Sequence, residues 1–176
     1  LNVFCLKSIN LIFFALFLLV LYLLLARRLP PFEAALILSV FAFSPLLLQF
    51  NNQLTSDIAF LFFSTLGLLI IVERNSISLY KNILLGLALF FAFFVRTNGI
   101  LLVPTLFLAQ IFSWLQTRPR LAPDWKRIVT NEAIPYYVFS LLTFLNLMLF
   151  PAGEGSHFEH LSLISLASLV DNVSAY

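Results

Sequence analysis

Long runs of Leu, Phe, Ile, Val and Ala alternate with short polar breaks along the chain. Runs of this length, at about 1.5 Å of rise per residue, are typical of helices that cross the apolar core of a membrane. The pattern therefore predicts an all-α, polytopic bundle of about six spanning helices. Their expected bounds are residues 9–26, 32–50, 58–72, 82–95, 99–115 and 133–150.

Charged residues and prolines mark where the first two runs stop or bend. Arg27 and Arg28 end the first run, and Pro30 and Pro31 follow at once. Proline removes a backbone donor and clashes with the preceding helical turn, so the chain is expected to break there. Pro45 lies inside the second run, where we expect a kink.

The composition supports a membrane protein. Hydrophobic residues make up 61% of the 176 positions, charged residues only 10%, and there are 21 Phe. A soluble domain carries about 25% charged residues, so too little polar surface is present to cover a water-facing globule. The single Cys5 excludes an internal disulfide and a cysteine-based metal site. No basic run is long enough to bind nucleic acid.

The positions of Lys and Arg predict the orientation. If six spans alternate, Lys7 and Arg96 lie on one side and eight of the ten basic residues lie on the other. Basic loops are retained in the cytoplasm, which makes the eight-residue side cytoplasmic. The eight are Arg27, Arg28, Arg74, Lys81, Arg118, Arg120, Lys126 and Arg127.

The last part of the chain differs from the rest. We divide the sequence into a transmembrane domain, residues 1–150, and an outward-facing segment, residues 151–176. In the latter, Leu161 and Ile164 would line one side of an interfacial helix, and a truncated seventh span is the alternative. Serines that recur at every third position favour the interfacial helix; they are Ser162, Ser165 and Ser168. The start at Leu1 without a signal peptide, and the abrupt end, suggest a fragment of a longer membrane protein.

A polar cluster, residues 51–57, precedes the third span and ends in Asp57. An acidic residue at a helix start complements the macrodipole, and Thr55 and Ser56 are candidate caps. Alternatively, the Asp57 carboxylate acts on a substrate from an outer cavity or holds a neighbouring side chain. Asn52, in the same cluster, is a candidate substrate-binding residue.

Arg96 interrupts the chain between the fourth and fifth spans, on the outward side. Three interpretations stay open: the side chain extends to the membrane interface, pairs with Asp57, or binds a phosphate, for which a planar guanidinium is well suited. Asn98 beside it is a further candidate for substrate binding. Gly99 permits a tight turn or a helix start.

The segment after residue 150 holds weaker candidates. His157, Glu159 and His160 have metal-ligand chemistry, but their spacing favours solvated loop residues, so we predict no metal site. His157 is kept as a candidate substrate-binding residue. Asn172 begins a glycosylation sequon that is too short to carry weight alone. No cofactor is indicated, and the need for a divalent metal is left open.

Two polar motifs carry a family resemblance. The stretch TSDIAFLFFSTLGLLIIVER, followed by a span that ends in VRTNGILLVP, resembles the GT-C fold membrane glycosyltransferases. It looks most like the family-39-like, protein mannosyltransferase-related members, and is also similar to the GPI second-mannosyltransferase family. The similarity covers about residues 40–110.

The resemblance implies an enzyme that transfers a hexose, such as mannose, from a polyprenyl- or dolichyl-phosphate donor on the periplasmic or lumenal side. Asp57 would be a supporting acid and Arg96 would lie near the donor phosphate. The family's principal catalytic acid would lie upstream of this fragment. The partners implied are the lipid-phosphate donor, membrane lipids and an unidentified acceptor, in the bacterial inner membrane or, alternatively, the endoplasmic reticulum.

Two other functions fit the pattern. A transporter or permease subunit also places polar residues at breaks between spans, although the polar groups here gather at span ends and no inverted repeat is present. A membrane scaffold without chemistry accounts for everything except an outward-facing Arg96.

Overall fold

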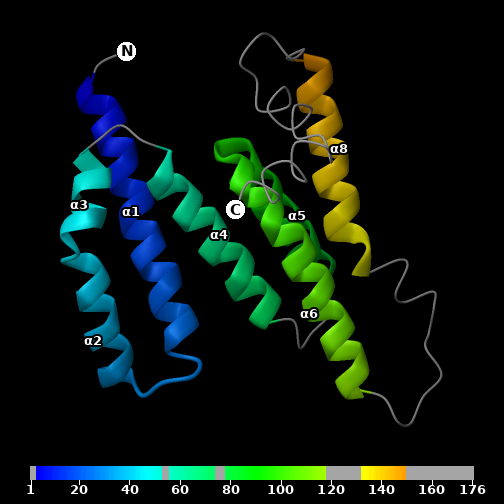
Figure 1. Ribbon diagram of the computed structural model, residues 1–176, viewed down its shortest axis with the longest axis horizontal. Coiled ribbons are helices and arrows are strands. Elements are labelled where there is room, and N and C mark those ends of the chain that lie inside the picture. The colour runs from blue at the N-terminus through cyan, green and yellow to red at the C-terminus, as the bar shows by residue number, and fades with distance from the viewer. Residues whose placement is uncertain (1–2, 53–55, 74–77, 118–131, 150–176) are drawn as a thin grey trace, which may run out of the picture. The chain divides into compact units, whose positions relative to one another are not determined.

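The computed structural model describes residues 3–52, 56–73, 78–117 and 132–149, and all regular structure in these ranges is helical (Figure 1). The predicted all-α class is therefore confirmed. In chain order the helices are α1 (Val3–Leu25), α2 (Pro31–Ala42), α3 (Pro45–Asn52), α4 (Asp57–Val72), α5 (Leu79–Val95), the 3-10 helix η1 (Thr97–Leu101), α6 (Leu102–Thr117) and α8 (Ile134–Leu149).

The segment predicted as one kinked span, residues 32–50, forms two helices. α2 ends at Ala42, Phe43 caps it by donating its N–H to the Ser39 carbonyl, and α3 begins at Pro45. Proline disfavours helical geometry in the residue before it but fits the first turn of a new helix. A full break at Ser44 therefore replaces the expected kink.

α4 packs against both α1 and α5. Phe14 and Phe17 of α1 form a buried cluster with Ile58 at the start of α4. Further along, Arg27 after α1 meets Glu73 after α4, so these two helices run parallel. α4 and α5 are joined by a short connector and run antiparallel.

A second apolar cluster joins α4, α5 and α6. Its fully buried members include Leu85, Leu89 and Ala92 of α5 and Leu106 of α6. Aromatic rings extend the packing across three helices: Phe13 of α1 lies beside Phe62 and Phe63 of α4, and Phe63 stacks on Phe91 of α5 at a centroid distance of 5.1 Å.

Only small residues fit where α5 meets the first turns of α8. A Cβ atom at Gly86 would lie 2.6 Å from Val138 Cβ and 2.8 Å from the Pro135 carbonyl oxygen. Real Cβ atoms do not approach other atoms so closely, so a glycine is needed for this close contact between helices.

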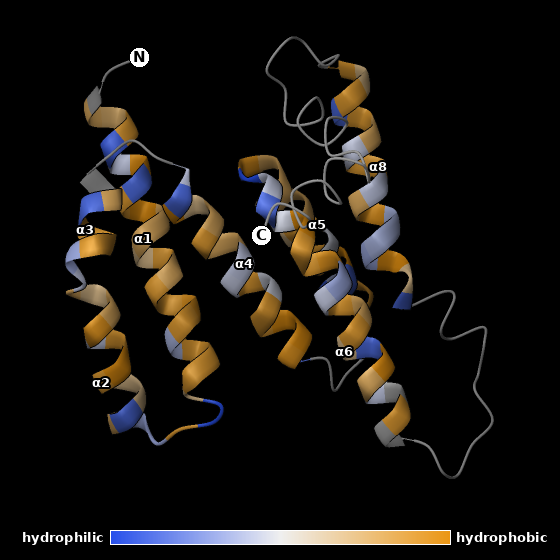
Figure 2. Cartoon of the chain, viewed as in Figure 1, coloured by the Kyte–Doolittle hydropathy of each residue, from blue (hydrophilic) through white to orange (hydrophobic). Residues whose placement is uncertain are grey.

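One helix in the described residues is long and apolar enough to cross a membrane. Its candidate span, Phe4–Leu25 of α1, has a mean hydropathy of 2.7, and the other apolar helices have 10–17 residues. Apolar residues line the helices along most of their length (Figure 2). Large apolar side chains are also strongly exposed; for example, Phe32 is 77% and Phe43 is 79% accessible.

The chain divides into two compact units, Leu1–Ser140 and Leu141–Tyr176. This boundary lies inside α8, before the domain limit expected after residue 150. The candidate site and its supporting contacts all belong to the first unit.

Candidate functional site

Charged side chains gather at the two opposite ends of the antiparallel helices α4 and α5. One group is an ion pair between Asp57 at the start of α4 and Arg96 at the end of α5, here called the Asp57–Arg96 pair. The other consists of Arg27, Glu73 and Lys81 and is called the Glu73 cluster.

Asp57 is the first residue of α4, and its side chain is 18% exposed. Ser56 before it makes no side-chain capping hydrogen bond, so the expected cap at this residue is absent. The carboxylate complements the positive end of the helix dipole and at the same time pairs with Arg96. Asp57 thus holds a neighbouring side chain, one of the roles considered from the sequence.

Arg96 follows the last residue of α5 in an extended conformation, with φ −152° and ψ 132°. Its N–H donates to the Ala92 carbonyl at 3.1 Å, and its own carbonyl accepts from the Gly99 N–H at 2.8 Å. Its side chain is 48% exposed although it pairs with Asp57. A guanidinium has five N–H donors, so one carboxylate does not exhaust its binding capacity.

The Arg-Thr-Asn-Gly segment reverses the chain within one turn. η1 starts at Thr97 and lies back against the end of α5. A Cβ atom at Gly99 would lie 2.3 Å from the Ala92 carbonyl carbon and 2.4 Å from the Phe93 nitrogen. Backbone atoms cannot move aside as a flexible side chain can, so only glycine allows η1 to pack here. By allowing η1 to pack on α5, Gly99 helps to fix the position of Arg96 between these two helices.

The other predicted site residues are not all within the described part of the chain. Asn98 is exposed in η1, two residues after Arg96. Asn52 is the last residue of α3, and its side chain lies outside the described residues, as does all of His157. Of the candidates, the structure brings together Asp57 and Arg96.

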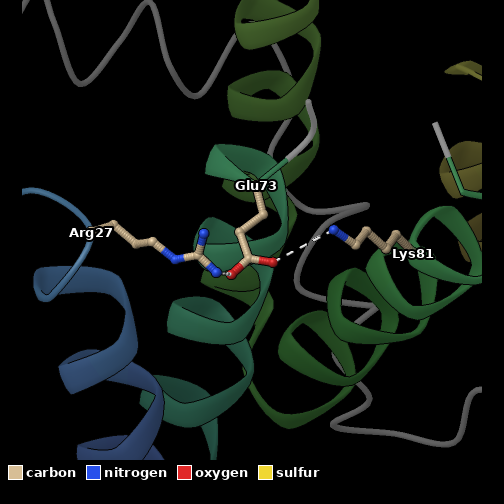
Figure 3. A network of polar contacts seen from close by, with 3 residues as sticks. All are labelled: Arg27, Glu73 and Lys81. Atoms are coloured by element: carbon tan, nitrogen blue, oxygen red, sulfur yellow. Dashed lines mark hydrogen bonds and ion pairs between the residues drawn. The ribbon is translucent and has the colours of Figure 1, made fainter. Parts of the chain in front are cut away.

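The Glu73 cluster is a feature that the sequence analysis did not single out. Arg27 and Lys81 both bind the Glu73 carboxylate, Lys81 at 3.6 Å (Figure 3). Glu73 caps the C-terminus of α4 and Lys81 lies in the first turn of α5, so each charge opposes its own helix dipole. Placing them together offsets both unfavourable charges. The sequence could have indicated this cluster, because only a short connector separates acidic Glu73 from basic Lys81.

A polar contact between α6 and the start of α8 was also missed. Tyr136 donates its hydroxyl to Gln110 Oε1 at 2.9 Å, and Gln110 Nε2 donates to the Glu132 carbonyl at 3.1 Å. Sequence periodicity cannot reveal such a pair, because its two residues are separated by a long polar segment.

Within the described ranges, no three His, Cys, Asp or Glu residues lie close enough to hold a metal ion. Comparison with known proteins found no protein-family model, no curated protein and no solved structure that matches the chain. The geometry of the Asp57–Arg96 pair is therefore the main support for a function.

Proposed function

We propose that this chain is part of a multi-pass membrane glycosyltransferase that transfers a sugar from a polyprenyl- or dolichyl-phosphate donor, with a GT-C-like membrane domain. The single observation that carries the proposal is the Asp57–Arg96 pair. It puts a half-exposed guanidinium beside a carboxylate at one end of an otherwise apolar pair of helices.

Multi-pass insertion is supported by helix length and by the exposed surface. α4 has 16 residues and α5 has 17, or about 24–26 Å each at 1.5 Å per residue, close to the thickness of a hydrocarbon core. Phe94 of α5 is 51% exposed, and Phe107 and Phe112 of α6 are 55% and 63% exposed. Exposed apolar surface of this extent is costly in water and favourable in lipid.

The orientation that we propose rests on the two charged groups. The Glu73 cluster contains two basic residues at the end of α4 and α5 that we assign to the cytoplasm, with Arg28 in the adjoining turn. The Asp57–Arg96 pair then faces the periplasm or lumen. An arginine on that side is disfavoured by the positive-inside rule, so its presence calls for a functional reason.

In this proposal Arg96 binds the donor phosphate and Asp57 orients Arg96. A fixed guanidinium stabilises the negative charge that develops on the leaving phosphate as the sugar is transferred. The acceptor hydroxyl must lose its proton to a carboxylate base. Because the Asp57 carboxylate is engaged by Arg96, we assign the base to another carboxylate rather than to Asp57.

The test uses the intact protein in membranes and a panel of polyprenyl-phosphate sugars. Wild type, Arg96→Ala and Arg96→Lys are compared with Arg27→Ala, which removes the same side-chain type from an ion pair at the opposite end of α4. We expect transfer to be lost in Arg96→Ala, partly restored in Arg96→Lys and retained in Arg27→Ala.

Two results would overturn the proposal. One is equal transfer by wild type and Arg96→Ala at matched expression, which would remove Arg96 from the site. The other is failure of wild type to consume any donor while a small solute crosses the bilayer, which would indicate a transporter instead.

A further inference from the structure

We infer that Asp57 cancels the preference of Arg96 for the more highly charged phosphate, so that the dianionic lipid phosphate left after transfer binds no more tightly than the monoanionic donor. The inference rests on the proposed function and adds a step to it, the release of the spent lipid phosphate. It depends on the juxtaposition of a carboxylate and a half-exposed guanidinium.

The Asp57 carboxylate contacts the Arg96 guanidinium directly. Any phosphate that binds the exposed part of Arg96 therefore lies within a few ångströms of a fixed negative charge. The Asp57 side chain is only 18% exposed, so water and salt screen that charge less than they would at an open surface. The formal charge of the pair is zero, in contrast to the single positive charge of a lone arginine.

The transfer reaction changes the charge of the lipid. The donor is a phosphodiester with one negative charge. Transfer breaks the bond between the sugar's anomeric carbon and the bridging phosphate oxygen, and the electron pair stays on that oxygen. The acceptor oxygen forms the new bond to the anomeric carbon and its proton goes to the base. The remaining phosphate monoester has a second pKa near 6 and carries close to two negative charges at neutral pH.

A lone arginine would hold this product more tightly than the donor, because attraction grows with the ligand's charge. Asp57 repels the added charge and so offsets the extra attraction that Arg96 alone would exert on it. The product then gains no advantage over the donor, and the spent lipid leaves without first being modified.

Few other ionisable groups face this end in the described residues. η1 and α6, which adjoin Arg96, contain none, and α4 contributes Asp57. α1, which packs on α4, has Cys5 and Lys7 near its start. The ionisable residues of α5, Tyr80 and Lys81, lie at its other end.

The experiment measures equilibrium binding of two simple probes to the full chain in a non-ionic detergent. Dodecyl phosphate represents the monoester and methyl dodecyl phosphate represents the diester. The measured quantity is the ratio of the diester Kd to the monoester Kd. If a variant also displaces Arg96, both affinities fall together and the ratio does not change.

In wild type we expect a ratio near one at pH 5 and at pH 8. In Asp57→Asn the ratio should rise about tenfold at pH 8, as one uncompensated unit charge within a few ångströms predicts, and return toward one at pH 5. Asp57→Glu should keep the wild-type ratio, and Arg27→Ala should too. The wild-type pH profile needs no variant, so the inference is testable even if Asp57→Asn does not fold.

The outcomes separate the two proposals. Unchanged binding of both probes by Arg96→Ala would overturn the phosphate site and the proposed function with it. Loss of both probes in Arg96→Ala, together with the same ratio in Asp57→Asn and wild type, would overturn this inference alone. A wild-type ratio that rises about tenfold from pH 5 to pH 8 would also contradict it.

Discussion

The two charged ends of α4 and α5 have similar chemistry but different connections. In the Glu73 cluster one carboxylate is shared by two cations, so either cation can be lost while the carboxylate keeps a partner. The Asp57–Arg96 pair joins one acid to one base, with the arginine held by a tight chain reversal. Two cations on one carboxylate are typical of a structural ion-pair network. A single oriented and half-exposed cation is better suited to a binding site.

The largest expected effect comes from Gly99, which holds the segment after Arg96. In Gly99→Ala the new Cβ would lie 2.3–2.4 Å from the backbone of Ala92 and Phe93, so η1 must move away from α5. We expect a loss of about 3 kcal/mol or more in the free energy of unfolding, measured in mixed micelles.

Gly67→Ala is the matched control, since among the described residues its Cβ would meet Leu102 Cδ1 alone, at 3.9 Å, an ordinary contact. Equal stability of the two variants would contradict the assignment of Gly99 as the residue that permits the reversal.

A smaller difference in the free energy of unfolding is expected between Arg96→Ala and Arg27→Ala. Arg96→Ala leaves the Asp57 carboxylate, only 18% exposed, without its cation. We expect this to cost about 1–2 kcal/mol of stability, less than a fully buried pair because Arg96 is 48% exposed. Arg27→Ala should cost about 0.5 kcal/mol or less, because Lys81 still pairs with Glu73. The same denaturation measurement compares them, and a larger loss for Arg27→Ala would reverse our interpretation.

Removal of the Glu73 charge tests whether the two cations of the Glu73 cluster are redundant. Glu73→Gln removes the shared anion and leaves Arg27 and Lys81 close together, so it should cost more than Arg27→Ala, about 0.5–1 kcal/mol. Since these side chains are partly exposed, 1 M salt, with a screening length of about 3 Å, should remove most of that cost. A salt-independent loss would mean that Glu73 acts through packing rather than charge.

Much of the architecture was predictable because it depends on local patterns. Apolar runs and their polar breaks indicated an all-helical chain, and the acid and base at the ends of two runs identified Asp57 and Arg96 as candidates. The sequence could not choose between pairing and extension to the interface for Arg96, because that choice depends on how α4 packs against α5. The break at Ser44 was underestimated because the apolar run continues through it.

Tertiary packing also explains what the sequence could not predict. Gly99 was expected to permit a tight turn or a helix start, and the structure shows that it allows η1 to approach the backbone of Ala92 closely. Gly86 has a related role against Val138, with no signal in the local pattern. The Glu73 cluster combines residues from three segments, which periodicity alone does not bring together.

The central claim is that the two charged ends face opposite sides of a membrane, and thiol labelling tests it most directly. Cys5 is the single cysteine of the chain and is exposed near the start of α1, at the Asp57–Arg96 end. Tyr80 is 72% exposed at the other end, so Tyr80→Cys in a Cys5→Ser background provides the matched probe without disturbing the Glu73 cluster.

With a membrane-impermeant maleimide on spheroplasts, we expect Cys5 to react at once and Tyr80→Cys to react only after permeabilisation. Reaction of both cysteines from outside, or of Tyr80→Cys alone, would contradict the account.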